Sequence, residues 1–482
     1  MEKASLQALN EQFSRIGYHP DEWNRMLADE IKKSNKKFVV LDDDPTGVQT
    51  VHGITVFTDW SVESIKKGFA LDDKLFYLLT NSRGLTVEQT TVLHNEIAAN
   101  VIQAAKEMNQ EFAVISRSDS TLRGHYPLET RILKENLEAG MGQKIDGEVL
   151  FPFFKEGGRF TANNIHYVNY DDVLIPAGET EFAKDKTFGY QSSDLCKYVE
   201  EKTEGEFKAK DVTPISLYSL RNGEINVIKH QLLEVKDFNK IIVNALDYQD
   251  VAVFCTALYQ AMAEGKNFIF RTAASFVKVL GGIPDKPLLT RKDMIQKETN
   301  HGGIIVVGSH TQKTTEQVEE LKKLSGLEFI EFNSDLVLED RLEEEVKRVT
   351  ELSTRIIAEG KTVVAYSKRK LLVVEHDTKE QALVRSVKIS DAVSALVGRL
   401  RIEPGFVIAK GGITSSDVGV KALRVRQAEV LGQIRPGIPV WKTDAGSKFP
   451  GIPYVIFPGN VGTRDTLREA VEILLSQNKK DF

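Results

Sequence analysis

Cysteine is scarce in this sequence, which has 482 residues and only two cysteines, Cys196 and Cys255. The two lie far apart and in no metal or redox spacing, so a disulfide framework is excluded and a reducing cytosol is favoured. Long apolar runs are also missing, which argues against a membrane-spanning helix. The first thirty residues contain acids throughout and lack the apolar stretch of a secretory signal. We therefore expect a cytoplasmic protein with no membrane partner.

Charge of one sign is not in large excess, since 63 basic and 69 acidic residues give a net charge of -6. This balance gives no reason to expect a nucleic-acid partner. The sequence contains neither GxxxxGK[ST] nor GxGxxG, which disfavours a P-loop enzyme and leaves a dinucleotide site unsupported. None of the nine histidines forms an HxxxH pair, and no Cys/His cluster offers zinc ligands. The sequence identifies no set of metal ligands.

Short β-rich runs alternate with longer amphipathic segments along most of the chain, a pattern typical of parallel α/β layers. Residues 1–36 show helical spacing of apolar side chains and are predicted to form a helical arm. The segment 281–303 has Gly and Pro at both ends and no apolar periodicity, which indicates a domain connection. A chain of this length exceeds what one core usually supports. We predict two α/β domains, 37–285 and 300–482, with mostly parallel sheets that face each other across an inter-domain cleft.

Residues that directly follow a strand are of interest because ligands of open α/β sheets bind outside the carboxyl ends of the strands. In the predicted first domain these positions hold acids, arginines and hydroxyls: Asp42, Asp43, Asp44, Ser82, Arg83, Arg117, Asp119, Ser120 and Arg123. A guanidinium group pairs with a carboxylate, and hydroxyls and carboxylates suit sugar hydroxyls. The surface therefore fits a small polyhydroxy acid. The alternative is that the arginines only neutralise the acids in structural ion pairs.

In the predicted second domain the same positions are mostly glycines and hydroxyls. Gly411, Gly412, Gly459 and Gly462 are predicted at strand-to-helix junctions, where backbone N–H groups can approach an anion. Thr414, Ser415 and Thr463 are available as helix caps. This set has no side-chain charge and suits a phosphate. The alternative is that these glycines only form turns.

A phosphatase interpretation arises from the acidic turn itself. Asp42, Asp44 and Thr46 satisfy DxDxT after an apolar strand, which resembles the nucleophile motif of haloacid-dehalogenase-type phosphatases. Ser309, after the run IIVVG, resembles their second motif. No later strand ends in the acidic pair that would complete their magnesium site. A sugar phosphatase that uses Asp42 is kept as an alternative.

Five blocks taken together resemble the four-carbon acid sugar kinases. The segment Asp43-Asp44-Pro45-Thr46-Gly47 is similar to the DD(F/L)TG signature that opens this family. The blocks NSRG, DSTLRG, KGGITSSD and PGNVG are similar to its later blocks in the same order, between about residues 37 and 470. The chain departs from the family pattern at Asp42, Pro45 and Ile413, where a small residue, an apolar or aromatic residue and an acid are usual.

The resemblance implies a transferase of carbohydrate metabolism with an alcohol group as acceptor. Such a kinase would use ATP to phosphorylate the terminal 4-hydroxyl of a four-carbon sugar acid such as D-threonate, D-erythronate or a 3-oxo-tetronate. It would have an acid-sugar-binding N-terminal domain and a nucleotide-binding C-terminal domain. By position, the acid sugar would contact Asp43, Arg83, Asp119 and Arg123. ATP would contact Ser309, Gly411, Gly412, Ile413, Thr414 and Gly459, with Gly462 nearby, and Mg²⁺ is expected to arrive with the nucleotide.

Two carboxylates are candidates for the catalytic role. We assign Asp43 to orient or deprotonate the substrate hydroxyl and Asp44 to position it or to contact magnesium, and the choice between them stays open. Closure of the cleft would align the two ligands and exclude water. A non-catalytic sensor of nucleotide and sugar acid is a third hypothesis. The stereochemistry of the acid, the metal ligands and assembly into a homo-oligomer also stay open.

Overall fold

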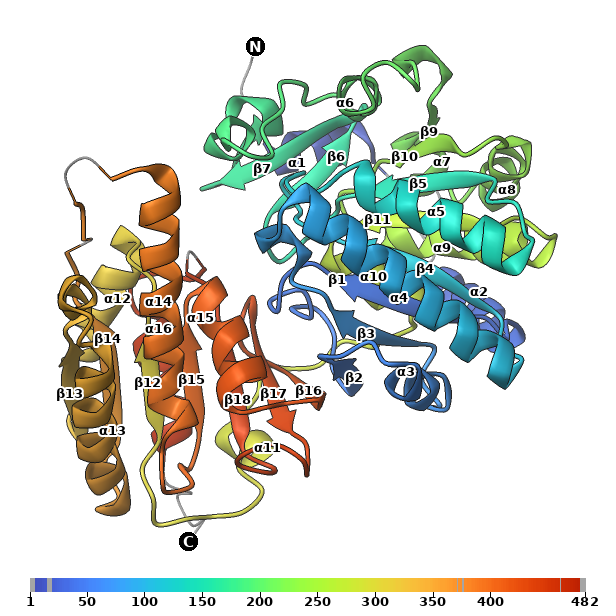
Figure 1. Cartoon of the computed structure of the whole chain (residues 1–482). Helices are drawn as coiled ribbons and strands as arrows, with labels where there is room; N and C mark the ends of the chain where they lie inside the picture. The colour runs from blue at the N-terminus through green and yellow to red at the C-terminus, as the bar shows by residue number, and fades with distance from the viewer. Residues whose placement is uncertain (1–4, 15–19, 371, 375–376, 460, 477–482) are drawn as a thin grey trace, which may run out of the picture. The chain divides into compact units, whose positions relative to one another are not determined.

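Two units make up the chain in the computed structural model, which describes residues 5–14, 20–370, 372–374, 377–459 and 461–476. The first unit comprises Met1–Val51 and Asp59–Asp285, and the second comprises His52–Thr58 and Lys286–Phe482. Both are α/β structures with mostly parallel sheets, as predicted (Figure 1). The segment His52–Thr58, which the sequence analysis placed in the first domain, is grouped with the second unit. The domain boundaries and the inter-domain cleft stay predictions.

The first unit contains a parallel sheet with the strand order β3-β1-β4-β11-β5-β10-β9. Its strands are β1 (Lys37–Asp42), β3 (Leu75–Leu79), β4 (Phe112–Arg117), β5 (Gly147–Phe151), β9 (Thr213–Ile215), β10 (Asn239–Val243) and β11 (Phe268–Thr272). Most of these strands are unbroken apolar runs rather than alternating ones because both faces of the sheet are buried. Every residue of β3, β5 and β11 is buried.

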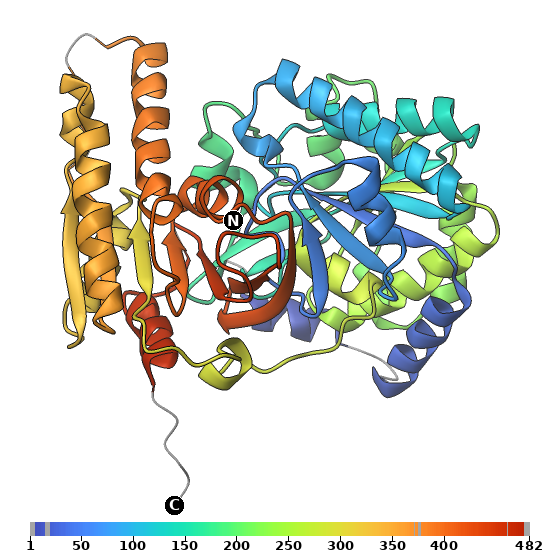
Figure 2. The same cartoon turned by 60° about the horizontal axis from the view of Figure 1, so that its bottom comes forward.

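Helices cover both faces of this sheet, as Figure 2 shows. One group packs together on one face: α3 (Val62–Phe69), α4 (Val87–Met108) and α5 (Leu128–Met141). The other group packs around α9: α2 (Pro20–Lys33), α7 (Leu217–Arg221), α8 (Ile225–Glu234), α9 (Tyr248–Ala263) and α10 (Ala274–Leu280). Local signals fix the helix starts, since Thr86 with Gln89 and Asp247 with Asp250 form capping boxes at α4 and α9.

The predicted N-terminal arm packs on its own unit. It forms α1 (Leu6–Gln12) and α2, and α2 lies against α9. The Arg221 guanidinium donates to the Phe13 carbonyl and to Asn10 Oδ1, at 2.7 Å each. Residues 1–4 and 15–19 of the predicted arm lie outside the described residues.

A three-stranded antiparallel sheet, which the sequence analysis did not predict, follows β5. It consists of β6 (Arg159–Ala162), β7 (Ile165–Tyr170) and β8 (Val173–Pro176). Tyr190 and Tyr198 of the neighbouring core donate to the carbonyls of Thr121 and Leu122, at 2.8 and 2.9 Å. Because these carbonyls belong to the loop after β4, the core beside the small sheet fixes a loop of the predicted sugar site. Helix α6 (Leu195–Lys202) belongs to the same region.

The second unit contains a mixed sheet with the order β13-β14-β12-β15-β18-β17-β16-β2. Its strands are β2 (Ile54–Phe57), β12 (Ile304–Val307), β13 (Leu327–Phe332), β14 (Thr362–Ser367), β15 (Val407–Lys410), β16 (Gln427–Arg435), β17 (Ile438–Thr443) and β18 (Pro453–Phe457). The pairs from β13 to β18 are parallel, whereas β17 and β2 pair antiparallel with their neighbours. Strand β17 was not predicted from the sequence.

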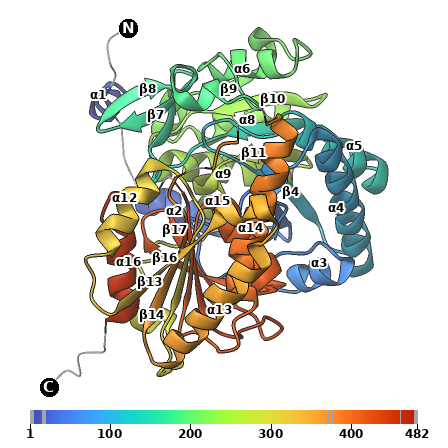
Figure 3. The same cartoon turned by 60° about the vertical axis from the view of Figure 1, so that its left-hand side comes forward.

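Helices lie on both faces of the second sheet (Figure 3). One group is α13 (Leu342–Ala358), α14 (Lys379–Gly398) and α15 (Gly412–Asp417), and the other is α11 (Arg291–Met294), α12 (Gln312–Leu321) and α16 (Thr466–Leu475). The predicted connection 281–303 contains α11, and its Leu289 and Met294 are buried in the core of the second unit. The connection is therefore partly an element of the second domain. No helix in the described parts of the chain is long and apolar enough to cross a membrane.

Candidate functional site

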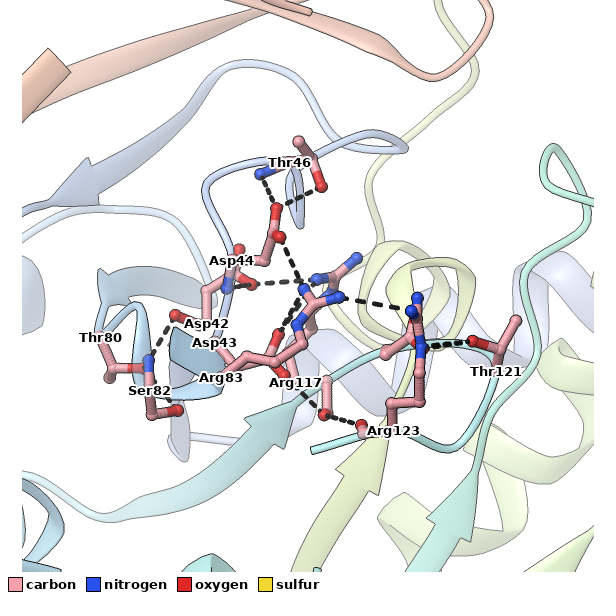
Figure 4. Close-up of polar contacts among 12 residues, drawn as sticks. Asp42, Asp43, Asp44, Thr46, Thr80, Ser82, Arg83, Arg117, Thr121 and Arg123 are labelled. Carbon is pink, nitrogen blue, oxygen red and sulfur yellow. Dashed lines mark hydrogen bonds and ion pairs between the residues drawn. The ribbon is translucent and has the colours of Figure 1, made fainter. Parts of the chain in front are cut away.

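The ends of three neighbouring strands bring the predicted acids and arginines together. Strand register places Asp42 beside Leu79 of β3 and beside Arg117 of β4. The turn after β1, the 3-10 helix Ser82–Gly84 after β3 and the loop after β4 therefore start at the same edge of the sheet. Figure 4 shows Arg83 and Arg117 pointing toward the acidic turn.

Asp42 faces into the protein. Its Oδ1 accepts from Arg117 Nη1 at 3.1 Å, and its exposed fraction is 1%. A Cβ at Gly47 would lie 2.0 Å from Asp42 Oδ2, so only glycine fits above this carboxyl. Burial raises the pKa of Asp42 to about 7 in spite of Arg117. An enclosed carboxyl of this kind does not suit a nucleophile that must attack a phosphate ester.

Asp43 is the best placed of the three acids to act on a hydroxyl. Its Oδ1 accepts from Arg83 Nη2 at 3.1 Å, and its Oδ2 accepts from Ser118 Oγ at 2.7 Å. Each oxygen keeps a lone-pair site for a further donor, because a carboxylate offers about four. Burial raises its pKa, although Arg83 and Arg117 oppose this. Gly124, at φ +119°, lets its loop pass close to this site, since a Cβ there would lie 2.8 Å from Ser118 Oγ and 2.6 Å from Arg271 Nη2.

Asp44 holds the turn in place. Its Oδ1 accepts from the backbone N–H of Thr46 at 2.8 Å and from the Thr46 hydroxyl at 2.5 Å. Its Oδ2 lies 2.8 Å from Arg83 Nη2. Burial opposes ionisation, but Arg83 and the two bonds from Thr46 outweigh it and lower the pKa of Asp44. Asp44 is therefore a fixed anion, which suits a positioning role better than proton transfer.

Asp119 and Arg123 form a second pair in the loop after β4. Arg123 Nε donates to Asp119 Oδ2 at 2.7 Å, and Arg123 Nη1 lies 3.9 Å from Asp185 Oδ2. Asp119 is also 3.7 Å from Arg83 Nη1. Burial opposes ionisation of Asp119, but the two arginines outweigh it and lower its pKa well below its usual range. All four predicted sugar-site residues, Asp43, Arg83, Asp119 and Arg123, thus belong to one network.

Beneath this network lies a pair that the sequence analysis missed. Glu129 of α5 accepts from Arg271 of β11, from Ser82 Oγ at 2.7 Å and from Ser116 Oγ at 3.1 Å. Burial opposes ionisation of Glu129, but Arg271 and His94 outweigh it and lower its pKa to about 2. The pair is buried and holds the strand ends together. Arg271 ends an apolar run, which was a usable signal, whereas nothing in the sequence marks Glu129.

In the second unit, glycine allows three loops to meet. A Cβ at Gly308, directly after β12, would lie 2.2 Å from Thr414 Oγ1 of α15. Ser309 Oγ accepts from Thr314 Oγ1 at 3.1 Å, and Thr314 also lies 3.0 Å from the Gly459 carbonyl. The predicted nucleotide residues after β12, β15 and β18 are therefore in mutual contact.

The KGGITSSD block begins α15. Gly411 is its N-cap residue at φ +126°, a conformation that favours glycine. A Cβ at Gly412 would meet no atom within 4 Å, so the space beside it is open. Ile413 is 73% exposed. Open space beside exposed backbone fits a phosphate group.

The predicted helix-cap roles of Thr414, Ser415 and Thr463 are wrong. Thr414 and Ser415 lie inside α15 and do not cap it; the Ser415 hydroxyl donates instead to the Ala409 carbonyl at 2.8 Å. Thr463 precedes Asp465, the N-cap residue of α16. Of the PGNVG block, Gly462 has φ +82° and packs on Thr466, while Asn460 lies outside the described residues.

Two cations border these loops, which corrects the expectation that the set has no side-chain charge. Lys410 ends β15, and its Nζ donates to the Pro458 carbonyl at 2.5 Å. Burial, together with Lys313, lowers the pKa of Lys410 to about 7. Arg369 Nη2 donates to the Ser309 carbonyl at 2.6 Å, and its buried Nη1 has no partner. The position of Lys410 after an apolar strand was a usable signal, but Arg369 is brought in by tertiary structure.

The donor set therefore fits an anionic nucleotide better than it fits a protein-held metal. Backbone groups, hydroxyls and two cations line the glycine loops. Within the described part of the chain, no group of three or more His, Cys, Asp or Glu side chains is arranged to hold a metal ion. A magnesium ion would need ligands from the nucleotide as well.

Two family models match the chain. A sugar-binding N-terminal domain matches residues 38–280, and a nucleotide-binding C-terminal domain matches residues 304–467. The chain is similar to a D-threonate kinase from Salmonella typhimurium LT2, with 20% identity over 453 residues, which cover 90% of this chain and 97% of that protein.

Solved structures with the same fold are also found. Haemophilus influenzae protein HI1011 superposes with a TM-score of 0.60 at 17% identity, covering 91% of this chain and all of that one. A Salmonella typhimurium LT2 protein that carries the name tRNA synthase gives a TM-score of 0.64 at 14% identity, covering 90% and 98%. At these identities the likeness establishes a shared fold.

Proposed function

Because the chain belongs to the four-carbon acid sugar kinase family, we propose that it uses ATP to phosphorylate the terminal 4-hydroxyl of a four-carbon sugar acid. The candidate acids are D-threonate, D-erythronate and 3-oxo-tetronates. The similarity to a D-threonate kinase supports the reaction class, and the polar groups of the first unit support an acidic, hydroxyl-rich substrate.

The proposal rests on one observation: the residues that follow the strands of the first sheet differ in chemical character from those that follow the strands of the second. In the segment matched by the sugar-binding model, the strand ends hold Asp43, Arg83, Asp119 and Arg123 in one ion-pair network. In the segment matched by the nucleotide-binding model, they hold glycine loops with two cations. The first set suits hydroxyls and a carboxylate, and the second suits phosphates.

We assign the activation of the substrate hydroxyl to Asp43. A general base works best when its pKa lies near the working pH, and burial raises the pKa of both Asp42 and Asp43. Asp42 is enclosed beneath Gly47, so Asp43 is the one of the two that keeps accepting capacity for a substrate hydroxyl. Ser118 and Arg83 fix the orientation of its carboxylate. Asp44 keeps the turn and Arg83 in position through Thr46.

We assign nucleotide binding to Ser309, Gly411, Gly412, Ile413, Thr414, Gly459 and Gly462. The open space beside Gly412 would admit a phosphate to the start of α15. ATP with its Mg²⁺ would supply the phosphoryl group and neutralise its charge. Lys410 and Arg369 hold the Pro458 and Ser309 carbonyls, and so fix the two loops on either side of Gly411.

A coupled assay for ADP formation over a panel of four-carbon acids tests the proposal. We expect ADP to form only when one of the acids is present, with one stereoisomer preferred. Phosphate release from sugar phosphates without ATP would instead support the phosphatase. Binding of both ligands without turnover would support the sensor.

A further inference from the structure

Besides Arg271, which is paired with Glu129, four arginines of the described residues lie near the predicted sugar site, and they differ in how their donors are used. Arg83 Nη2 contacts Asp43 and Asp44 at 3.1 and 2.8 Å, and its Nη1 lies 3.7 Å from Asp119. Arg117 Nη1 contacts Asp42 at 3.1 Å and lies 3.7 Å from Asp43. The Nε of each is buried without a partner, but ion pairs commit both guanidinium groups to the acidic turn.

Arg123 and Arg159 have donors to spare. Arg123 uses Nε on Asp119, and no described residue accepts from its Nη2. Arg159, at the start of β6, donates from Nη1 to the Gly157 carbonyl, and its buried Nε has no partner. Among the described residues, no carboxylate lies within ion-pair distance of Arg159.

The same aromatic ring supports both of these arginines. The Arg123 guanidinium carbon lies 5.0 Å from the centre of the Phe182 ring, and that of Arg159 lies 5.6 Å from it. Stacking on a ring fixes the plane of a guanidinium while leaving its N–H edge available. The antiparallel strands β6–β8 thus place a second arginine beside the Asp119–Arg123 pair.

Burial of a guanidinium without an acidic partner is unfavourable. It lowers the pKa of Arg159, and nearby Asp119 only partly opposes this. A bound anion would provide the missing partner. This deepens the proposed function, on which it rests, because that function requires a place for the carboxylate of the acid sugar.

We propose that Arg159, together with Arg123, binds the carboxylate of the acid substrate and thereby selects acids over neutral polyols, whereas Arg83 mainly holds the acidic turn. Arg159 is then a specificity-determining residue on β6. The predicted role of Arg83 changes accordingly: its ion pairs orient Asp43 and Asp44, and its contact with the substrate is secondary.

Direct binding of D-threonate and D-erythronate, measured by isothermal titration without nucleotide, tests this inference separately from turnover. We expect Arg159→Ala to weaken binding of the preferred acid about 10- to 100-fold, the range for loss of a charge-assisted hydrogen bond. Arg159→Lys should recover part of the affinity. The matched control is Arg131→Ala, which removes an exposed arginine paired with Glu206 at the surface, and it should leave binding unchanged.

A second readout is selectivity for the carboxylate. The affinity ratio between threonate and its neutral amide should fall in Arg159→Ala by the same factor as the threonate affinity, and the KM for ATP should change less than about twofold. A melting curve for each variant checks that it is folded. Unchanged acid affinity and an unchanged ratio in a folded Arg159→Ala would overturn the inference. Acid binding by the wild type without ADP formation would overturn the kinase proposal alone, and a wild type that binds none of the acids would overturn both.

Discussion

Replacement of Asp43 by asparagine (D43N) separates catalysis from structure at the acidic turn. Asparagine keeps an oxygen that can accept from Ser118, which lies 2.7 Å from Asp43 Oδ2. Arg83 would lose one contact at 3.1 Å but keep Asp44 at 2.8 Å. The lost charge-assisted bond costs about 1.5–3 kcal/mol, and removal of a buried charge offsets part of this. The free energy of unfolding should therefore fall by less than about 3 kcal/mol.

Turnover should respond much more strongly. A positioned general base contributes about 10²- to 10⁴-fold, so we expect D43N to lower kcat at least about a hundredfold, which corresponds to about 2.7 kcal/mol of barrier. The assay is acid-dependent ADP formation, with chemical denaturation for stability. Asp44→Asn is the matched control: it also removes an ion pair with Arg83 but keeps an oxygen that accepts from Thr46, and it should affect stability more than kcat. A D43N protein that retains kcat within about threefold of the wild type would refute the role of Asp43.

The pH dependence of stability gives a further check on the same residue. The folded-state pKa of Asp43 is raised above its ordinary value of 3.8. Between the two pKa values the Asp43 carboxyl therefore stays protonated in the folded state but is ionised in the unfolded state. The stability that this protonated carboxyl contributes is lost as pH rises through the pKa of the folded state. D43N cannot ionise, so its stability relative to the wild type should improve as pH increases from about 4. A constant difference across this range would contradict the raised pKa.

Three further predictions concern the second unit. Gly412→Ala adds a methyl group to open space, so the stability of the protein should be unchanged. The KM for ATP should rise about tenfold or more because the methyl group would occupy space proposed for a phosphate. An unchanged KM would show that Gly412 does not belong to the nucleotide site. Gly308→Ala places its Cβ 2.2 Å from Thr414 Oγ1, so chemical denaturation should show that the free energy of unfolding falls by about 1–3 kcal/mol. An unchanged free energy of unfolding would contradict this packing. The pKa of Lys410 is lowered from 10.5 to about 7, so the unfolded state binds more protons between these values and stability should rise with pH. Relative to Lys410→Met, the wild type should gain up to about 1.4 kcal/mol per pH unit there, and parallel stability curves would contradict the shift.

Most of the main sheet strands were predictable because buried parallel strands are continuous apolar runs bounded by turn residues. Strands β6 to β8 were missed because they are short, and because polar residues interrupt the apolar ones in β6 and β7. Their turns nevertheless had a local signal. Asn163 and Asn164, and then Asp171 and Asp172, all have positive φ, which is the requirement of tight two-residue hairpins and which Asn and Asp tolerate well.

The residues of the candidate site also divide into those that the sequence predicts and those that only the structure shows. Asp43, Arg83, Asp119 and Arg123 follow strand ends directly, so parallel topology alone predicts that they gather at one edge. Arg159 and Glu129 reach the network from a hairpin strand and a helix, and their contribution depends on tertiary contacts that no local pattern contains. The individual roles of Asp42, Asp43 and Asp44 likewise required burial and partners, because three adjacent carboxylates look alike in sequence.

The most direct test of the central claim is a ³¹P NMR spectrum of the purified chain incubated with ATP, Mg²⁺ and the preferred four-carbon acid. We predict an acid-dependent phosphomonoester signal coupled to the C4 methylene protons, together with an equal amount of ADP. Inorganic phosphate as the only product, or an ester on a carbon other than C4, would contradict the account.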